Sequence, residues 1–112
     1  MLSVIYLLWF SSKVMEKWRD DAAVNVILHT KRMFLLDKLE IDNDFMARFN
    51  EILSKHEMDY IKSRSSRLHR AKSFIETLAM KLTTDVFYHL LCVLPNALRR
   101  EVFQAYRSSK SV

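Results

Sequence analysis

The sequence predicts an all-α fold, an antiparallel bundle of six helices in a single domain. Its 112 residues include no glycine and one proline, Pro95, whereas tight hairpin turns need residues that accept a positive φ. Half of the residues are apolar and 28% are charged, which is the balance of a folded globular protein rather than a disordered one. A chain of this length can bury one modest hydrophobic core.

The N-terminal segment, residues 1–21, is expected to lie outside the bundle. It begins with an apolar run, MLSVIYLLWF, which has roughly half the length that a bilayer span needs. The run lacks the positively charged start and the small-residue cleavage site of a secretion signal. We therefore expect an extra helix or an extension docked on the core. The sequence leaves open that this segment attaches the domain to a membrane or to a larger scaffold.

The first predicted helix of the bundle covers residues 22–39. Its apolar spacing slips at residues 29–32, so we expect the helix to bend or divide there. A second helix has apolar residues at the i, i+4, i+7 and i+8 positions and ends near Ser54. Three residues can cap its start by accepting free amide hydrogens: Asp42, Asn43 and Asp44.

The third and fourth helices contain the most basic part of the chain. The short segment 57–63 predicts a third helix that exposes Glu57 and Asp59. Ser65 or Ser66 then caps a fourth helix. Its apolar residues share one face at the 3.6-residue period: Leu68, Ala71, Ile75, Leu78, Ala79 and Leu82. Four residues lie on the opposite face and are expected to point into solvent: Arg67, Arg70, Thr77 and Lys81.

Two further helices complete the predicted domain, which covers residues 22–107. Thr83 or Thr84 caps the fifth helix, and Pro95 ends it. Asn96 can cap the sixth helix, and residues 108–112 are expected to form a flexible tail. Eight apolar residues are expected to face inward from these two helices: Val86, Phe87, Leu90, Leu91, Leu94, Leu98, Val102 and Tyr106.

Charge is distributed unevenly along the chain. The net charge is +5, and residues 62–81 alone carry six basic residues against one acidic residue. Residues 37–59 carry seven acidic residues against three basic ones. A nucleic-acid-binding surface gains from uniform positive charge, whereas a protein that binds copies or relatives of itself gains from both signs on different faces. The distribution favours the second kind of partner, although any solvated helix bundle carries charged faces.

The sequence contains no convincing catalytic or metal site. Glycine-rich phosphate loops are impossible without glycine, and Asp42 and Asp44 are better explained as helix caps than as an acid–base pair. Cys92 lies three residues after His89, but the apolar run FYHLLCVLP around it predicts a buried, unreactive thiol. Four histidines lie on separate elements and form no zinc-binding pair: His29, His56, His69 and His89. We therefore expect no enzyme, no metal and no cofactor, and a single cysteine fits a reducing compartment such as the cytoplasm.

The segment 34–95, FLLDKLEIDNDFMARFNEILSKHEMDYIKSRSSRLHRAKSFIETLAMKLTTDVFYHLLCVLP, resembles a caspase recruitment domain (CARD), a branch of the death-fold superfamily. The resemblance extends over about residues 22–107. It rests on a divided first helix ending in LLDKLE, a second helix in FMARFNEIL and a short acidic third helix in EMDYIKS. The SSRLHRAKSFIETL pattern and the fifth helix in DVFYHLLCVLP follow. The resemblance implies a death fold, a Greek-key-like bundle with a bent or split first helix.

The resemblance also implies where the chain binds its partners. In the best-known contact of the family, basic residues on the first and fourth helices of one domain meet acidic residues on the second and third helices of another. The matching basic patch here is Lys31, Arg32, Arg67, Arg70 and Lys72. The matching acidic patch is Asp42, Asp44, Glu57 and Asp59. Arg67, Arg70 and Lys72 fall in the basic segment 62–81, and the whole acidic patch falls in the acidic segment 37–59.

The function implied by the resemblance is that of an adaptor without catalysis. It would recruit a caspase or another CARD-containing adaptor in apoptotic or inflammatory signalling, and assemble with itself into oligomers or filaments. Neither a nucleic acid nor a membrane is expected as its partner. The sequence leaves open a CARD-only regulator, a piece of a longer protein, an activating or inhibitory role, and another death-fold branch (death domain, death-effector domain or pyrin domain). The alternative function is a small basic module that binds nucleic acid through Arg64, Arg67, Arg70 and Lys72.

Overall fold

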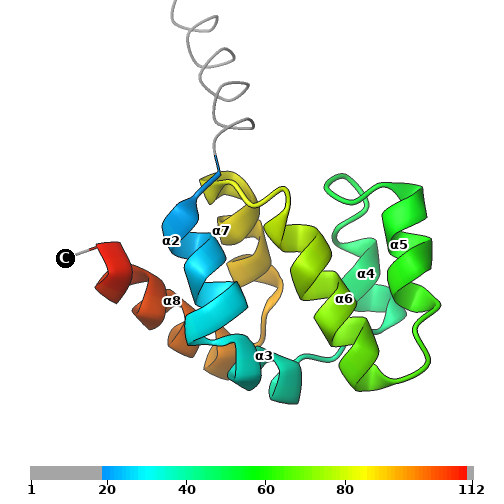
Figure 1. Ribbon diagram of the computed structural model, residues 1–112, viewed down its shortest axis with the longest axis horizontal. Helices are drawn as coiled ribbons and strands as arrows, with labels where there is room; N and C mark the ends of the chain where they lie inside the picture. Colours follow the sequence, from blue (N-terminus) through cyan, green and yellow to red (C-terminus); the bar gives the residue numbers. More distant parts are fainter. Residues whose placement is uncertain (1–18, 111–112) are drawn as a thin grey trace, which may run out of the picture.

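The computed structural model describes residues 19–110, and this part of the chain is helical, with connecting turns and no strand (Figure 1). The all-α prediction is confirmed. The predicted extra helix within residues 1–21 lies almost entirely outside the described residues. The elements are α2 (Asp21–Asn25), the π-helix η1 (Val26–Thr30), α3 (Arg32–Lys38), α4 (Asn43–Ala47), α5 (Lys55–Lys62), α6 (Arg67–Ala79), α7 (Thr84–Val93) and α8 (Asn96–Lys110).

The helix expected at residues 22–39 is interrupted where its apolar spacing slips. After α2 the backbone widens into η1, in which the Lys31 amide donates to the carbonyl of Val26 at 2.7 Å, five residues back. Lys31 itself leaves the helical region, with φ −115° and ψ 16°, and α3 begins at the next residue. This break lets α3 turn and pack against α6, while η1 contacts both α6 and α8.

The second predicted helix is shorter than expected, because α4 ends at Ala47 rather than near Ser54. The following amides bond three residues back instead of four, as in the Phe49 amide to Met46 carbonyl bond at 3.0 Å. The Arg48 carbonyl accepts a hydrogen bond from His89 Nε2 at 2.6 Å. The tightened turn still buries Phe49, because a three-residue period keeps the apolar side chains on nearly the same face.

The core contains two groups of aromatic rings, one from α4, the turn after it and α6, and the other from α7 and α8. The ring centroids of Phe45, Phe49 and Phe74 lie 5.0 to 5.2 Å from one another, at the tilted and edge-to-face angles that aromatic pairs prefer. A second aromatic contact joins Phe87 of α7 to Tyr106 of α8, with centroids 4.4 Å apart. The helix α6 packs against α3, α5 and η1, and α8 packs against α2, α7 and η1. In Figure 1, α4 and α5 therefore lie at one end and α8 at the other.

Two residues expected in the core are exposed. Leu68 is 49% exposed, because it lies in the first turn of α6, beside the connection from α5, where no neighbouring helix covers it. Cys92 is also exposed. At 100° per residue its side chain points away from the inward face that Phe87, Leu90 and Leu91 define. The apolar neighbours of Cys92 in the sequence thus misled the prediction. At the C-terminal end, α8 continues to Lys110, beyond the expected start of the tail.

The start of α2 is joined to two distant helices through Asp20. One carboxylate oxygen of Asp20 accepts the amide hydrogen of Ala23 at 3.1 Å and so caps α2. The other accepts hydrogen bonds from Thr84 Oγ1 at 2.6 Å and from the Tyr106 hydroxyl at 2.7 Å. The Asp20 amide donates to the carbonyl of Leu82 at 2.9 Å. Burial favours a higher pKa for Asp20, but the hydrogen bonds from Thr84, Tyr106 and Ala23 outweigh it and lower the pKa.

Replacing Asp20 by Asn is expected to lower the free energy of unfolding at pH 7 by about 1 to 3 kcal/mol, since hydrogen bonds to a charged acceptor are lost. The folded-state pKa of Asp20 is depressed, so its contribution is present above the unfolded pKa of about 3.9 and is lost as the pH falls through the lower folded pKa. The difference between wild type and D20N should therefore shrink below about pH 4. Denaturant titrations from pH 7 to pH 3 measure this difference.

The neighbouring residue supplies the control. Asp21 is exposed and lies in the first turn of α2, so D21N removes the same charge without breaking a tie to α7 or α8. A loss of stability as large for D21N as for D20N would show that charge near the helix start matters, and not the hydrogen bonds of Asp20.

Candidate interaction surface

The predicted basic patch is partly used by the fold itself. Arg67, the first residue of α6, donates from one guanidinium nitrogen to the carbonyls of Leu36 at 3.0 Å and Leu39 at 3.1 Å. These carbonyls belong to the C-terminal end of α3, where helical partners run out. The expectation that Arg67 points freely into solvent is therefore wrong, because its charged group is bound to the backbone of another helix.

Arg70 is bound in the same manner. Its guanidinium donates to the carbonyl of Arg64 at 3.1 Å, in the turn between α5 and α6. The Arg64 guanidinium in turn lies over the ring of Tyr60, 4.5 Å from the centroid, and its Nε is buried without a hydrogen-bond partner. Arg64, Arg67 and Arg70 thus all contact other parts of the chain. The expectation that Arg70 points outward is wrong as well.

The remaining three basic candidates differ in their availability. Lys31 forms an ion pair with Glu101 of α8 at 3.0 Å, and its side chain is 26% exposed. Arg32 is half-buried and Lys72 is exposed. Among residues 19–110, neither Arg32 nor Lys72 has a hydrogen-bond or ion-pair partner. These two side chains are the part of the predicted basic patch that stays free for another molecule.

The acidic patch divides similarly. Asp42 caps α4 by accepting the Phe45 amide at 2.8 Å, as its place in the sequence predicts. Glu57, expected to be exposed, has a side chain only 28% exposed and pairs with Lys81 Nζ at 2.7 Å. Burial favours a higher pKa for Glu57, but the hydrogen bonds from Lys81 and the Ser54 amide outweigh it, so the pKa is lowered. Asp44 and Asp59 are exposed and have no partner in the described part of the chain.

Lys81 also differs from the expectation that it points outward. Besides Glu57, its ammonium group contacts the carbonyl of Ile52 at 3.1 Å. Ile52 lies in the turn that follows α4, so Lys81 joins the end of α6 to that turn and to α5. Glu57 completes a capping box with Ser54 at the start of α5. The pair is thus a structural clamp rather than part of a free charged surface.

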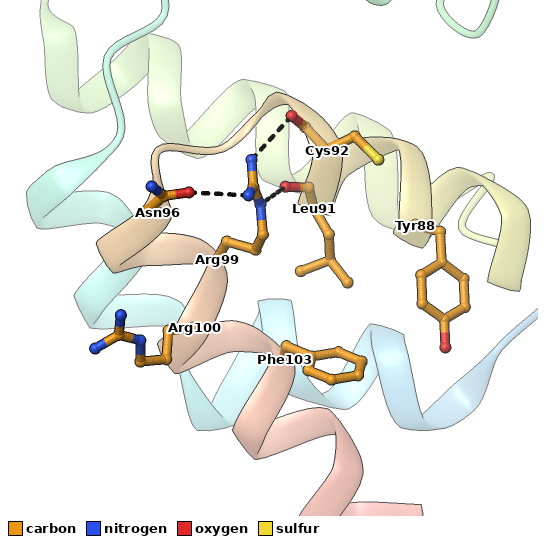
Figure 2. Close-up of a pocket in the computed structure, with 7 residues that line it drawn as sticks. All are labelled: Tyr88, Leu91, Cys92, Asn96, Arg99, Arg100 and Phe103. Atoms are coloured by element: carbon orange, nitrogen blue, oxygen red, sulfur yellow. Dashed lines mark hydrogen bonds between the residues drawn. The ribbon is translucent and has the colours of Figure 1, made fainter.

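A groove that the sequence did not reveal lies between α7 and α8 (Figure 2). Seven residues line a groove of about 550 Å³: Tyr88, Leu91, Cys92, Asn96, Arg99, Arg100 and Phe103. Tyr88 is 46% exposed, and the exposed thiol of Cys92 lies on the same side of α7. The groove was missed because Cys92 was expected in the core. The helical position of Cys92, opposite Leu90 and Leu94, could have predicted that its side chain is exposed on this face.

Arg99 lines this groove and joins its two helices. Its guanidinium donates to three carbonyls at the end of α7 and to the side chain of Asn96, at 2.7 to 3.2 Å: Leu91, Cys92, Leu94 and Asn96 Oδ1. Four of its five N–H donors are therefore directed at the chain itself. The adjacent Arg100 is exposed and has no such partner among residues 19–110.

Two other features complete the description of this surface. Among residues 19–110, no three His, Cys, Asp or Glu side chains gather as a metal site would require. No helix in the described range is long and apolar enough to cross a membrane. What the surface offers is unpaired charge on α3, α4, α5 and α6 together with an apolar groove on α7 and α8.

Arg67 and Lys72 allow a direct test of which basic residues belong to the fold. Arg67→Ala is expected to lower the free energy of unfolding by about 1 to 3 kcal/mol, because two carbonyls lose a charged donor. Lys72→Ala removes an exposed, unpaired charge and should change stability by no more than about 0.5 kcal/mol. Urea denaturation of both variants at neutral pH makes the comparison. Equal losses would contradict the assignment of Arg67 to the fold and Lys72 to the free surface.

Comparison with known proteins gives no relative from which a function could be transferred. No protein-family model, no curated protein and no solved structure matches this chain. The resemblance to a caspase recruitment domain accordingly stays a prediction, supported by the residues of the chain alone.

Proposed function

We propose that this chain is a death-fold interaction module of the caspase recruitment type, which binds domains of its own kind, a second copy included. Three features support the proposal. The described chain is helical, its first predicted helix divides at Lys31, and a short helix with an acidic first turn, α5, precedes the longer α6. In that role the domain acts as an adaptor that recruits a caspase or another adaptor, without catalysis of its own.

The observation that carries the proposal is the free charge of opposite sign on different helices. Between residues 19 and 110 three ion pairs form: Lys31–Glu101, Lys38–Asp37 and Lys81–Glu57. They leave Arg32 of α3 and Lys72 of α6 without an acidic partner, and Asp44 of α4 and Asp59 of α5 without a basic one. Charges that have no partner among the described residues are available to pair between molecules.

A contact between these residues is heterologous, because a basic surface of one copy meets an acidic surface of the next. Such contacts continue into helical filaments unless a rotation closes them into a ring. Because exposed charge pairs steer encounter and are screened by salt, assembly should weaken as ionic strength rises. Arg32, Lys72, Asp44 and Asp59 are the residues of the original two patches that fit this role.

The alternative function, nucleic-acid binding, loses support from the contacts of the arginines. Of its four predicted residues, Arg67 and Arg70 donate to backbone carbonyls and Arg64 lies over Tyr60. Of the four, Lys72 alone is exposed without a partner in the described part of the chain. Binding to nucleic acid strengthens with the number of phosphates that free cations neutralise, so the segment is a weaker nucleic-acid surface than its composition indicates.

Reversing the charge of the basic surface in one variant and of the acidic surface in another tests the proposal. Wild type is expected to self-associate at low salt in analytical ultracentrifugation. The variants R32E/K72E and D44K/D59K should each be monomeric, because like charges then face each other. An equimolar mixture of the two variants should form a complex again, since each variant keeps one original surface and the reversed surfaces complement each other. Raising the salt from about 50 mM to 500 mM should dissolve both the wild-type assembly and the mixed complex.

Three outcomes would overturn this proposal. They are a wild type that remains monomeric at low salt, double variants that associate as well as wild type, and a mixture that fails to form the complex. Circular dichroism of each variant establishes that it is folded. Binding of duplex DNA that depends on Lys72 but not on Asp44 or Asp59 would support the nucleic-acid alternative instead.

A further inference from the structure

The groove between α7 and α8 belongs to neither charged surface, and its composition indicates a partner of a different kind. We propose that this groove is a docking site for an acidic peptide segment that carries a bulky apolar side chain. The site lies on the faces of α7 and α8, whereas the charged surfaces of the proposed function lie on α3, α4, α5 and α6.

The walls of the groove are suited to an apolar side chain. Tyr88 and Leu91 come from α7, and Phe103 comes from α8. The Tyr88 ring is half exposed although it packs on Phe87, with the centroids 6.2 Å apart. A volume of about 550 Å³ lies in the range of pockets that hold small ligands or the anchoring side chains of a peptide. An aromatic or leucine side chain placed there would cover apolar surface that water now contacts.

The groove is held in place without a ligand. Arg99 joins the end of α7 to the start of α8 through hydrogen bonds to Leu91, Cys92, Leu94 and Asn96. A partner therefore meets two helices whose relative position is already fixed, which reduces the ordering cost of binding. Because four of its five N–H donors bond the chain itself, Arg99 mainly shapes the groove, and recognition of charge falls to other residues.

Charge complementarity identifies the partner as acidic. Arg100 lies on the rim, and Arg107 lies one helical turn beyond Phe103, with its guanidinium 5.8 Å from the ring centroid. Residues 100, 103 and 107 share one face of α8. Among residues 19–110, Arg100 and Arg107 have no acidic partner, while Glu101 on the neighbouring face is occupied by Lys31.

Asp85 sets a direction along the groove. It is exposed in the first turn of α7, one turn before Tyr88, and it repels acidic residues from that end. The acidic residues of a bound segment should therefore lie at the Arg100 end of the groove, and its apolar side chain between Tyr88 and Phe103. A nucleic acid fits less well, because apolar walls occupy most of the groove and the free cations near it number two among the described residues.

The single cysteine of the chain, Cys92, provides a reporter inside the groove. A library of random dodecapeptides displayed on phage is selected against the full-length protein. The enriched peptides should combine Asp or Glu with Leu, Phe or Trp, and they should slow the reaction of Cys92 with N-ethylmaleimide. Protein already alkylated at Cys92 should no longer bind the peptides, because the added group fills the groove.

Matched variants separate the charge of the groove from the total charge. Arg100→Glu is expected to raise the dissociation constant of the enriched peptides about tenfold or more, since an attractive contact becomes repulsive. Lys55→Glu makes the same change in charge at an exposed position on α5. It should change the dissociation constant of the peptides by no more than about twofold. The R32E/K72E variant, which disables the proposed assembly surface, should still bind the peptides.

The proposal is overturned if the enriched peptides show no preference for acidic residues, or if they bind the alkylated protein as well as the free protein. Equal effects of R100E and K55E would also overturn it. If single-stranded oligo(dT) displaces the peptides and binds with the same dependence on Arg100, the groove serves nucleic acid. If alkylation of Cys92 abolishes self-association, a second copy of the chain is the occupant.

Discussion

The rest of the structure depends on how the chain ends its helices without glycine. Helices commonly end at a residue in the left-handed conformation, which glycine adopts at no steric cost. This chain has no glycine, and no residue in the described range has a positive φ. The last carbonyls of the helices must then find other donors. Basic side chains supply them: Arg67 at the end of α3, Arg70 after α5, Lys81 after α4 and Arg99 at the end of α7.

These donors explain why the distribution of charge along the sequence does not translate directly into a surface. Each of the four side chains comes from a later helix or its end and reaches back to a carbonyl. Arg67 spans 28 residues to Leu39, whereas Arg99 spans eight to Leu91. A basic residue that closes a turn contributes to the net charge as much as one that faces a partner. The segment 62–81 therefore looks like one basic pole in the sequence, and in the folded chain only part of it is free.

Features determined by neighbouring residues could be predicted from the sequence. The cap of α4 at Asp42 and the division near Lys31 follow from side chains a few positions apart, and Ser66 and Thr83, which cap α6 and α7, were among the alternatives. The burial of Cys92 and Leu68 was predicted wrongly. The cysteine was judged by its apolar neighbours rather than by its helical angle, and the leucine lies at a helix end that nothing covers.

Contacts between distant segments could not be predicted from local pattern. The bonds of Asp20 to Thr84 and Tyr106 span 64 and 86 residues, and the capping preference of an aspartate gives no indication of them. The bound state of Arg67 and of Glu57, two residues of the predicted patches, depends on such contacts. Charge and periodicity indicated which segments carry the surface, and only the tertiary arrangement determined which side chains remain available in it.

Arg99 and Arg100 show that a residue that stabilises the fold and a residue available for binding can be neighbours in the sequence. They are adjacent in sequence, and 100° of helical rotation directs the first toward the carbonyls of α7 and the second toward solvent. The first donates to the carbonyls at the end of α7, where Pro95 stops the helix, and so joins the two helices that form the groove. The second is an exposed positive charge at the rim of that groove, without an acidic partner among residues 19–110. The absence of glycine therefore affects more than the ends of helices. Arg99, which supplies hydrogen-bond donors at the end of α7, also lines the groove between α7 and α8.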